Sequence, residues 1–282
     1  MATTTKEVPP LARLGVRPRL PDYLRSLWER RQFAMAIPRA QLQAQHRDTA
    51  LGGVWHLVDP LISVGIWWLL FGQILQVNRG VDNLIGFLAV GVFAFHFTQG
   101  SLKQGARSII SNEALVRAIS FPRAILPLSV VFAEVMSLGY AFSAMFIVVL
   151  LTGEDPSWTW LLLAPMVFLQ LLFTTGLALV MARLGDHFRD IAQMVPYGVR
   201  VWGMLSGVFF PVDRRLLPDH RTLFEVMQYN PAYLFMELPR KAILDNAAPS
   251  GRQWITLAVW GIVALVLGFL FFVRRENQYG RG

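Results

Sequence analysis

RDTALGGVWHLVDPLISVGIWWLLFGQIL, the stretch from Arg47 to Leu75, begins with charged residues and ends in bulky apolar ones. Such a run is either a buried helix of a soluble protein or the first crossing of a membrane, which takes about 20 apolar residues. The composition favours the membrane, because 54% of the 282 residues are hydrophobic and only 16% are charged. Soluble domains carry about 25% charged residues. The sequence therefore predicts an all-α integral membrane protein.

Six apolar runs are long enough to cross the hydrocarbon core of a bilayer as helices. Their approximate ranges are 60–77, 84–102, 124–151, 158–181, 191–210 and 254–273. Short polar turns, NRGVDN and TGEDPS, join the first run to the second and the third to the fourth. Each of these two pairs is therefore expected to form an antiparallel hairpin within a six-helix transmembrane domain at 60–273.

The distribution of Lys and Arg predicts the orientation of this domain. Eighteen of these residues fall on the side that carries both termini, and seven fall on the other side. Positive charge concentrates on the cytosolic side of membrane proteins, so both termini are predicted to be cytosolic. Residues 1–21, rich in Pro and Arg, are predicted to be a disordered tail, and residues 274–282 form a short C-terminal tail.

Two segments outside the spans also predict helices. Residues 22–59 indicate amphipathic helices on the inner membrane surface, with Leu24, Leu27 and Trp28 on one face. Residues 211–253 include LFEVMQYNPAYLFMELPRKAIL, which is apolar but too short and too interrupted by Pro for two further spans. We expect two short helices that re-enter the outer leaflet where protein covers their ends. A cap lying on the membrane surface is the alternative.

The residue inventory predicts a transport subunit rather than an enzyme. The chain has no Cys, its five His residues are scattered, and it lacks phosphate-binding loops and nucleophile motifs. The net charge of +8 comes mainly from Arg beside the apolar runs, where anionic headgroups attract it. We therefore expect no catalytic residue, no metal site, no cofactor bound by this chain and no nucleic-acid partner.

Two charged residues, Glu134 and Arg200, fall inside predicted spans. Charges at this depth are costly, so they usually face protein or water and find a partner. Each lies ~14 Å from the cytosolic end of its helix at the helical rise per residue. We hypothesise that the two residues pair or line the same polar path. The alternative is that one of them faces a water pocket unpaired.

Two local motifs predict features of single helices. Asp59 followed by Pro60 predicts the start of the first span, because Asp caps helices and Pro is favoured at their first position. Gly203 and Gly207 form a GxxxG motif in the fifth predicted span, which would permit close helix packing.

Four motifs that occur in order resemble the permeases of type-2 ABC exporters for polysaccharides. They are RDTALGGVWHLVDPL at 47–61, NEALVRAISFPRAILPLS at 112–129, FRDIAQMVPYGVRVWGMLSGVFFPVD at 188–213 and YNPAYLFMELPRKAIL at 229–244. The similarity covers about Leu24 to Arg275 and departs from the family at Asp48, where an aromatic residue is usual, and at Asp59, where Gln is common. The family includes the membrane subunits for O-antigen, teichoic acid, capsule and galactan export.

The resemblance implies a homodimer in the bacterial plasma membrane that works with two copies of a separate cytosolic ATPase, which would bind ATP and Mg²⁺. The cargo would be a glycan on a polyprenyl diphosphate lipid, moved along a path between the subunits. A helix within the cytosolic segment 103–123, capped by Ser111 or Asn112, would dock into the ATPase. The residues assigned to this coupling are Asn112, Glu113, Arg117, Phe121 and Arg123.

Aromatic side chains are candidates for lining such a path, because rings can cover the apolar faces of sugars without strong hydrogen bonds. The candidates are Trp67, Trp68, Phe71, Phe209 and Phe210. Trp67 and Phe71 share a helix face, whereas Trp68 turns ~100° away. Both Trp residues lie ~11 Å into the first span, deeper than an interfacial aromatic belt. At least one Trp is expected to face the cargo; membrane anchoring is the alternative.

Three other functions remain open from the sequence. A permease of the same type could carry a drug, an ion or another lipid. A secondary transporter would need coupling charges, for which Glu134 and Arg200 are the candidates, and would usually show an internal repeat that is not found here. A membrane enzyme acting on a lipid-linked sugar is the third possibility.

Overall fold

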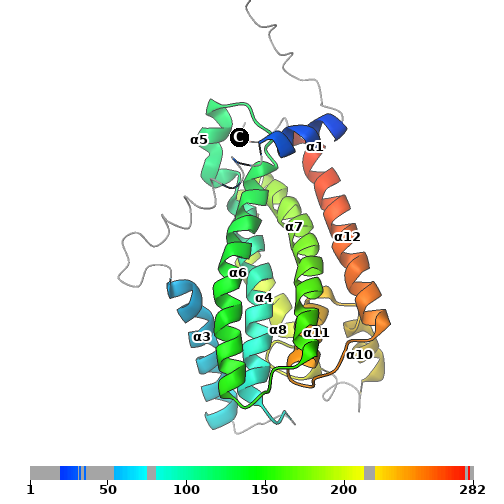
Figure 1. Ribbon diagram of the computed structural model, residues 1–282. Coiled ribbons are helices and arrows are strands. Elements are labelled where there is room, and N and C mark those ends of the chain that lie inside the picture. Colours follow the sequence, from blue (N-terminus) through cyan, green and yellow to red (C-terminus); the bar gives the residue numbers. More distant parts are fainter. Residues whose placement is uncertain are drawn as a thin grey trace, which may run out of the picture.

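The computed structural model describes residues 20–30, 32, 35, 54–74, 81–212, 220–276 and 279. Every regular element in these ranges is a helix, and the long helices run side by side (Figure 1). In chain order they are α1 (Leu20–Glu29), α3 (Trp55–Trp68), the π-helix η2 (Leu69–Ile74), α4 (Leu84–Arg107), the 3₁₀ turn η3 (Ile110–Asn112), α5 (Glu113–Ala118), α6 (Ile125–Leu151), the 3₁₀ turn η4 (Trp158–Leu162), α7 (Leu163–His187), α8 (Arg189–Leu205), α10 (Arg221–Met227), α11 (Pro231–Ile243) and α12 (Gly251–Val273).

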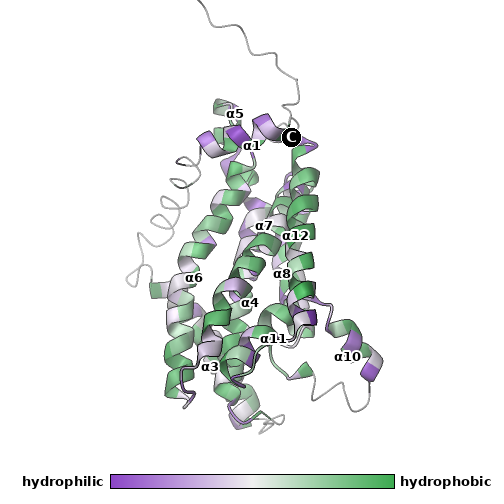
Figure 2. Cartoon of the chain, turned by 45° about the vertical axis from the view of Figure 1, so that its right-hand side comes forward, coloured by the Kyte–Doolittle hydropathy of each residue, from purple (hydrophilic) through white to green (hydrophobic). Residues whose placement is uncertain are grey.

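Within the described residues, four helical segments are long and apolar enough to cross a membrane, namely α4, α6, η4 with α7, and α12. Apolar residues dominate these helices, and hydrophilic residues gather near α1, α5 and α10 (Figure 2). The predicted all-helical class is confirmed. The first and fifth predicted spans coincide with shorter helices: an apolar stretch, Leu61–Ile74, and α8, which has 17 residues.

α4 forms the centre of the bundle. Of its apolar span 72% is buried, compared with 33% for α6 and 22% for α12. Phe93 and Phe97 of α4 are fully buried, and α4 packs against α3, α6, α7, α8 and α11. The outward side chains of α12, including Ile255, Val259 and Leu267, are apolar and exposed. This pattern places the surface of α12 toward lipid.

Small residues allow the closest helix contacts. Gly176 of α7 lies against the backbone of Ala264 and Gly268 in α12, and Gly185 of α7 lies against the backbone of Ala106 in α4. A side chain at any of these three glycines would collide with the neighbouring main chain. Small residues are the usual means of close helix approach in membranes, where helices gain little from hydrophobic burial.

A buried polar cluster fixes the register of α4 and α7. The amide of Gln170 donates to the backbone oxygen of Ala94 at 2.8 Å and to the hydroxyl of Thr98 at 3.0 Å. The hydroxyls of Thr98 and Thr174 lie 3.1 Å apart. These partners satisfy polar groups that have no access to water inside the bundle.

α8 ends five residues before the predicted limit of the fifth span. It stops at Leu205, because Gly207 adopts a φ of 87° and the amides of Gly207 and Val208 return to the oxygens of Met204 and Gly203, both at 3.4 Å. This Schellman arrangement terminates helices at a left-handed glycine. Gly207 therefore lies beyond the helix. The prediction that Gly203 and Gly207 form a GxxxG motif within one helix is wrong.

The start of the first apolar helix also differs from the prediction. α3 begins at Trp55, so Asp59 and Pro60 lie inside the helix and do not start it. The backbone oxygen of Asp59 accepts a hydrogen bond from the Ser63 hydroxyl at 3.0 Å. Pro60 removes one backbone hydrogen bond near the start of the helix, and the helix continues through it.

The short helices gather at two opposite ends of the bundle. α1 and α5 lie at the end that carries the C-terminus, and α10 and α11 lie at the other end (Figure 1). On α1, Leu20, Leu24 and Trp28 are exposed at intervals of four residues, and Tyr23 is buried. An exposed apolar line of this kind suits a helix on a membrane surface. Residues 1–19 and most of 31–53, which hold the predicted tail and much of the interface segment, lie outside the described residues.

The two helices before the last span have different environments. In α11 every residue except Lys241 is buried, and the Asn230 side chain caps it by accepting from the Ala232 amide at 3.1 Å. A helix covered by protein in this way is what the sequence predicts. α10 has no fully buried residue, although Phe224 and Met227 pack against the core, so its placement in the outer leaflet or on the membrane surface stays a prediction.

Candidate functional site

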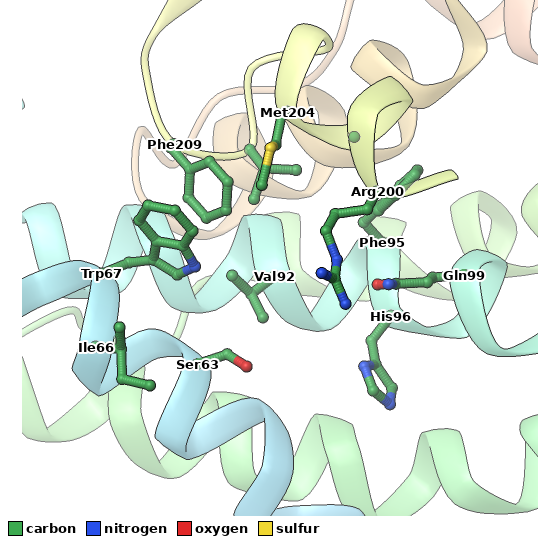
Figure 3. A pocket seen from close by; sticks show the side chains of 12 residues that line it. Ser63, Ile66, Trp67, Val92, Phe95, His96, Gln99, Arg200, Met204 and Phe209 are labelled. Carbon is green, nitrogen blue, oxygen red and sulfur yellow. The ribbon is translucent and has the colours of Figure 1, made fainter. Parts of the chain in front are cut away.

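A cavity of about 370 Å³ opens between α3, α4 and α8. Its volume lies at the lower end of the range for ligand pockets, about 300–1,000 Å³. Side chains from these three helices and from the turn after α8 point into it (Figure 3). They are Ser63, Ile66, Trp67, Val92, Phe95, His96, Gln99, Arg200, Gly203, Met204, Val208 and Phe209.

Aromatic rings form one end of the cavity. The Trp67 ring stacks on Phe71 with centroids 5.6 Å apart and an interplanar angle of 15°, which confirms that the two share a helix face. Phe209 lies against Trp67 with ring centroids 3.9 Å apart (Figure 3). Three of the five aromatic residues predicted for the path therefore form one cluster.

Phe71 does not itself line the cavity and contacts its wall through the Trp67 ring. Trp68 and Phe210, the other two predicted aromatic residues, are also not part of the cavity wall. Both pack against the hydrophobic core of the bundle, and the indole of Trp68 lies beside Gly72. Of the two adjacent tryptophans, Trp67 is thus the one that faces the cavity.

Polar side chains form the other end of the cavity. Ser63, His96, Gln99 and Arg200 come from three different helices and converge there, and the guanidinium of Arg200 extends toward His96 and Gln99 (Figure 3). Sequence reasoning missed His96 and Gln99. The signal was present, because the two polar residues lie three positions apart within a predicted span and therefore share a helix face.

Glu134 and Arg200 do not form the ion pair that was offered as one possibility. Glu134 is buried between α4 and α6, where its carboxylate accepts a hydrogen bond from Gln104 and packs against Gly100. None of the four ion pairs among the described residues includes either residue. Two charges at similar depth in the membrane need not be neighbours. Glu134 lies between α4 and α6, whereas Arg200 lies on α8.

Two contacts hold α8 in place beside the cavity. A Cβ at Gly203 would collide with the Phe95 ring, so glycine lets α8 approach α4 closely. The indole nitrogen of Trp202 donates to Asn230 at 3.1 Å, and Asn230 donates to the hydroxyl of Ser206 at 2.8 Å. The end of α8 is therefore tied to the start of α11.

Arg240 lies near the end of the cavity that is closest to α11. This buried arginine was not singled out from the sequence. Arg240 is 3% exposed and donates to the backbone oxygens of Phe87 at 3.2 Å, Gly207 at 2.8 Å and Val208 at 2.7 Å. Its guanidinium also lies 3.5 Å from the centre of the Phe87 ring. It links α4, α11 and the turn that carries Phe209.

At the opposite end of the bundle, the predicted coupling segment forms η3 and α5. Glu113 pairs with Arg117 at 2.5 Å and with Arg189 at the start of α8 at 3.7 Å. The Arg117 side chain is exposed. Neither predicted cap holds, because the Ser111 hydroxyl and the Asn112 amide instead donate backward to backbone oxygens, at 2.5 and 2.8 Å.

Phe121 and Arg123, also assigned to coupling, point into the protein rather than outward. Phe121 is buried in a cluster with Tyr23. The backbone amide of Arg123 donates to the Glu276 carboxylate at 2.6 Å, and its guanidinium donates to the backbone oxygens of Glu276, at 2.6 Å, and Tyr279. These two residues join the start of α6 to the chain after α12.

Tyr23 and Glu276 complete this junction. The Tyr23 hydroxyl donates to Glu276 at 2.9 Å, which ties α1 to the chain after α12. Burial, together with the nearby Glu276 carboxylate, raises the pKa of the Tyr23 hydroxyl, so it remains a donor at neutral pH. Burial also raises the pKa of Glu276, against the opposing effect of the hydrogen bonds that this carboxylate accepts.

The sequence as a whole matches known families and relatives. The ABC-2 type transporter family matches residues 32–244. The O-antigen export system permease protein RfbA of Myxococcus xanthus is 23% identical over 256 residues, which are 91% of this chain and 97% of that protein. The polysialic acid transport protein KpsM of Escherichia coli is 21% identical over 232 residues, 80% of this chain and 87% of that protein. The family match covers most of the chain, so this multi-pass membrane protein belongs to the ABC-2 type transporter family, as its four motifs indicated.

Proposed function

We propose that this chain is the permease subunit of an ATP-driven exporter that moves a polyprenyl-diphosphate-linked polysaccharide across the bacterial plasma membrane. The observation that carries the proposal is the near full-length similarity to permeases named for O-antigen export and polysialic acid transport. A cavity with an aromatic wall between three helices supports it. The chain itself supplies the path, and a separate ATPase supplies the energy.

The ATPase would bind at the end that carries α1, α5 and the C-terminus. α5 presents the exposed Arg117, and Glu113 connects α5 to Arg189 at the start of α8. A movement of α5 would therefore reach α8, which forms one wall of the cavity. The excess of Lys and Arg on this side of the chain supports a cytosolic location for it.

The surface of α8 supports a homodimer with the path at its interface. Gln193, Tyr197 and Arg200 are exposed on α8, and their spacing puts them on one helix face. Lipid would leave these polar groups without partners. The exposed surface of α8 carries these polar groups beside apolar residues such as Met194 and Leu205, a mixture that suits a second copy, in contrast with the apolar face of α12.

The two adjacent tryptophans give a matched test of the cargo path. We expect Trp67→Ala to reduce glycan transport roughly twofold to tenfold, because the substitution removes a ring that would stack on passing sugars. Trp68→Ala, which removes an equal ring outside the cavity, should keep transport near the wild-type rate. The measurement is ATP-dependent translocation of a lipid-linked glycan by the permease with its ATPase in vesicles. Equal transport by the Trp67→Ala variant and the wild type would exclude this wall from the path.

A further inference from the structure

Arg200 places a permanent positive charge within a predicted span, on an exposed face of α8. It lies 11 residues after Arg189, the first residue of α8, or about 16 Å along the helix axis. An ionisable side chain at such depth is costly unless an opposite charge, polar groups or water receives it. The group that binds the guanidinium of Arg200 therefore bears on the function of the protein.

The described part of the chain supplies no anion for Arg200. The cavity wall contains no Asp or Glu, and none of the ion pairs in the described ranges involves Arg200. Other arginines in the bundle are satisfied by the protein: Arg240 by three backbone oxygens and Arg183 by the backbone oxygen of Phe271. Arg200 instead extends into open space.

The surroundings of Arg200 suit a phosphate group. His96 and Gln99 carry hydrogen-bond donors and lie at the same end of the cavity, with the guanidinium pointing toward them (Figure 3). Arg binds phosphate through two parallel N–H donors, which gives both charge and orientation. The aromatic wall with Trp67 and Phe209 begins in the same cavity, next to this polar end.

We propose that Arg200, with His96 and Gln99, forms a subsite for the diphosphate group of the lipid-linked glycan, with the adjoining sugar against Trp67. This assignment rests on the proposed function. The charged head of the cargo would thereby be received inside the membrane by a cation for which the described residues supply no counter-ion. A single Arg in an open cavity also allows release, which transport requires as much as binding.

The test uses the permease assembled with its ATPase in lipid nanodiscs and two synthetic probes that carry the same disaccharide. One probe is a polyprenyl diphosphate and the other an uncharged polyprenyl ether. For the wild type, stimulation of ATP hydrolysis should be half-maximal at a lower concentration of the diphosphate probe. Arg200→Gln should raise that concentration about 10-fold to 100-fold, the range for a lost charged hydrogen bond, and leave the ether probe unaffected. Arg200→Lys should show a smaller loss.

Arg252→Gln is the matched control, because it removes the same charge at an exposed position in the first turn of α12. It should respond to both probes as the wild type does. If the wild type responds equally to both probes, the diphosphate subsite is wrong and the export function stands. If the wild type responds to neither probe, the proposed function itself fails.

Two further outcomes would overturn the subsite. Dissociation of the Arg200→Gln assembly into single permease chains, measured by light scattering, would mean that Arg200 has its counter-ion in a second copy. An effect of Arg200→Gln on inhibition by inorganic diphosphate alone, without an effect on the lipid probe, would mean that the cavity takes a free anion.

Discussion

Arg240 and Arg200 both lie on helices of the bundle, but Arg240 is buried and Arg200 is exposed. The three backbone oxygens around Arg240 lie within 3.2 Å of its guanidinium nitrogens, whereas Arg200 faces a cavity without carboxylates. A buried cation held by three backbone oxygens links the parts of a structure, and one that faces open space is available to a ligand. We therefore assign a structural role to Arg240 and a binding role to Arg200.

Replacement of Arg240 by methionine should destabilise the fold. The Arg240→Met substitution keeps an unbranched stem and leaves three buried carbonyl groups without their donor, so the free energy of unfolding should fall by about 2–5 kcal/mol. The thermal midpoint of the purified permease in detergent measures this change. Arg252→Met, at an exposed site, should change stability by less than about 1 kcal/mol. Similar midpoints for the two variants would contradict the structural role of Arg240.

At the residue scale, the sequence predicts neighbours along one helix better than neighbours between helices. The face shared by Trp67 and Phe71 follows from helical periodicity, and the stacked rings confirm it. The position of Glu134 relative to Arg200 depends on how α4, α6 and α8 pack, which no local pattern gives. Arg240 was missed for the same reason, since its three partners come from distant parts of the chain.

At the scale of elements, α1, the start of α6 and the chain after α12 meet through Glu276. Its carboxylate accepts from the Tyr23 hydroxyl and from the Arg123 amide, so it links three elements at the end where the ATPase is proposed to bind. These contacts make α1 part of the bundle. A force applied at this end would reach both α6 and α12.

The raised pKa of Glu276 predicts a pH effect on stability. Burial raises this pKa above the ordinary carboxyl value, so the folded protein holds the proton more tightly than the unfolded chain does. Stability should therefore fall as the pH rises from the ordinary carboxyl pKa through the raised one. Glu276→Gln keeps the accepting oxygen but cannot titrate, so thermal midpoints of the two proteins should diverge with pH. Parallel curves from pH 4.5 to 8 would show that the folded pKa is unshifted.

The ends of a helix could be predicted from the sequence where they coincide with the ends of an apolar run. They could not be predicted where a tight turn or tertiary packing sets them. The third predicted span, 124–151, agrees closely with α6, because its ends coincide with the ends of the apolar run. α8 stops early because Gly207 takes a left-handed backbone conformation, which the motif pattern alone did not indicate. α10 and α11 differ in burial although both come from one apolar segment, since only α11 packs beneath α4 and α7.

At the scale of the whole molecule, the surfaces formed by α12 and by α8 differ in character. α12 presents exposed apolar residues, whereas α8 presents Gln193 and Arg200 together with exposed apolar residues beside the cavity. A homodimer that joins the α8 faces would enclose the aromatic wall and leave α12 in contact with lipid. α5, the proposed coupling helix, lies at one end of this bundle, near the start of α8.

The central claim is that this permease exports a lipid-linked glycan only when its ATPase hydrolyses ATP. The most direct measurement is reconstitution of the permease with its ATPase in vesicles, with movement of a polyprenyl-diphosphate-linked glycan scored across the membrane. The account predicts translocation with ATP and none with a non-hydrolysable analogue or with the permease alone. Transport that persists without ATP, or under an ion gradient alone, would contradict it and favour a secondary transporter.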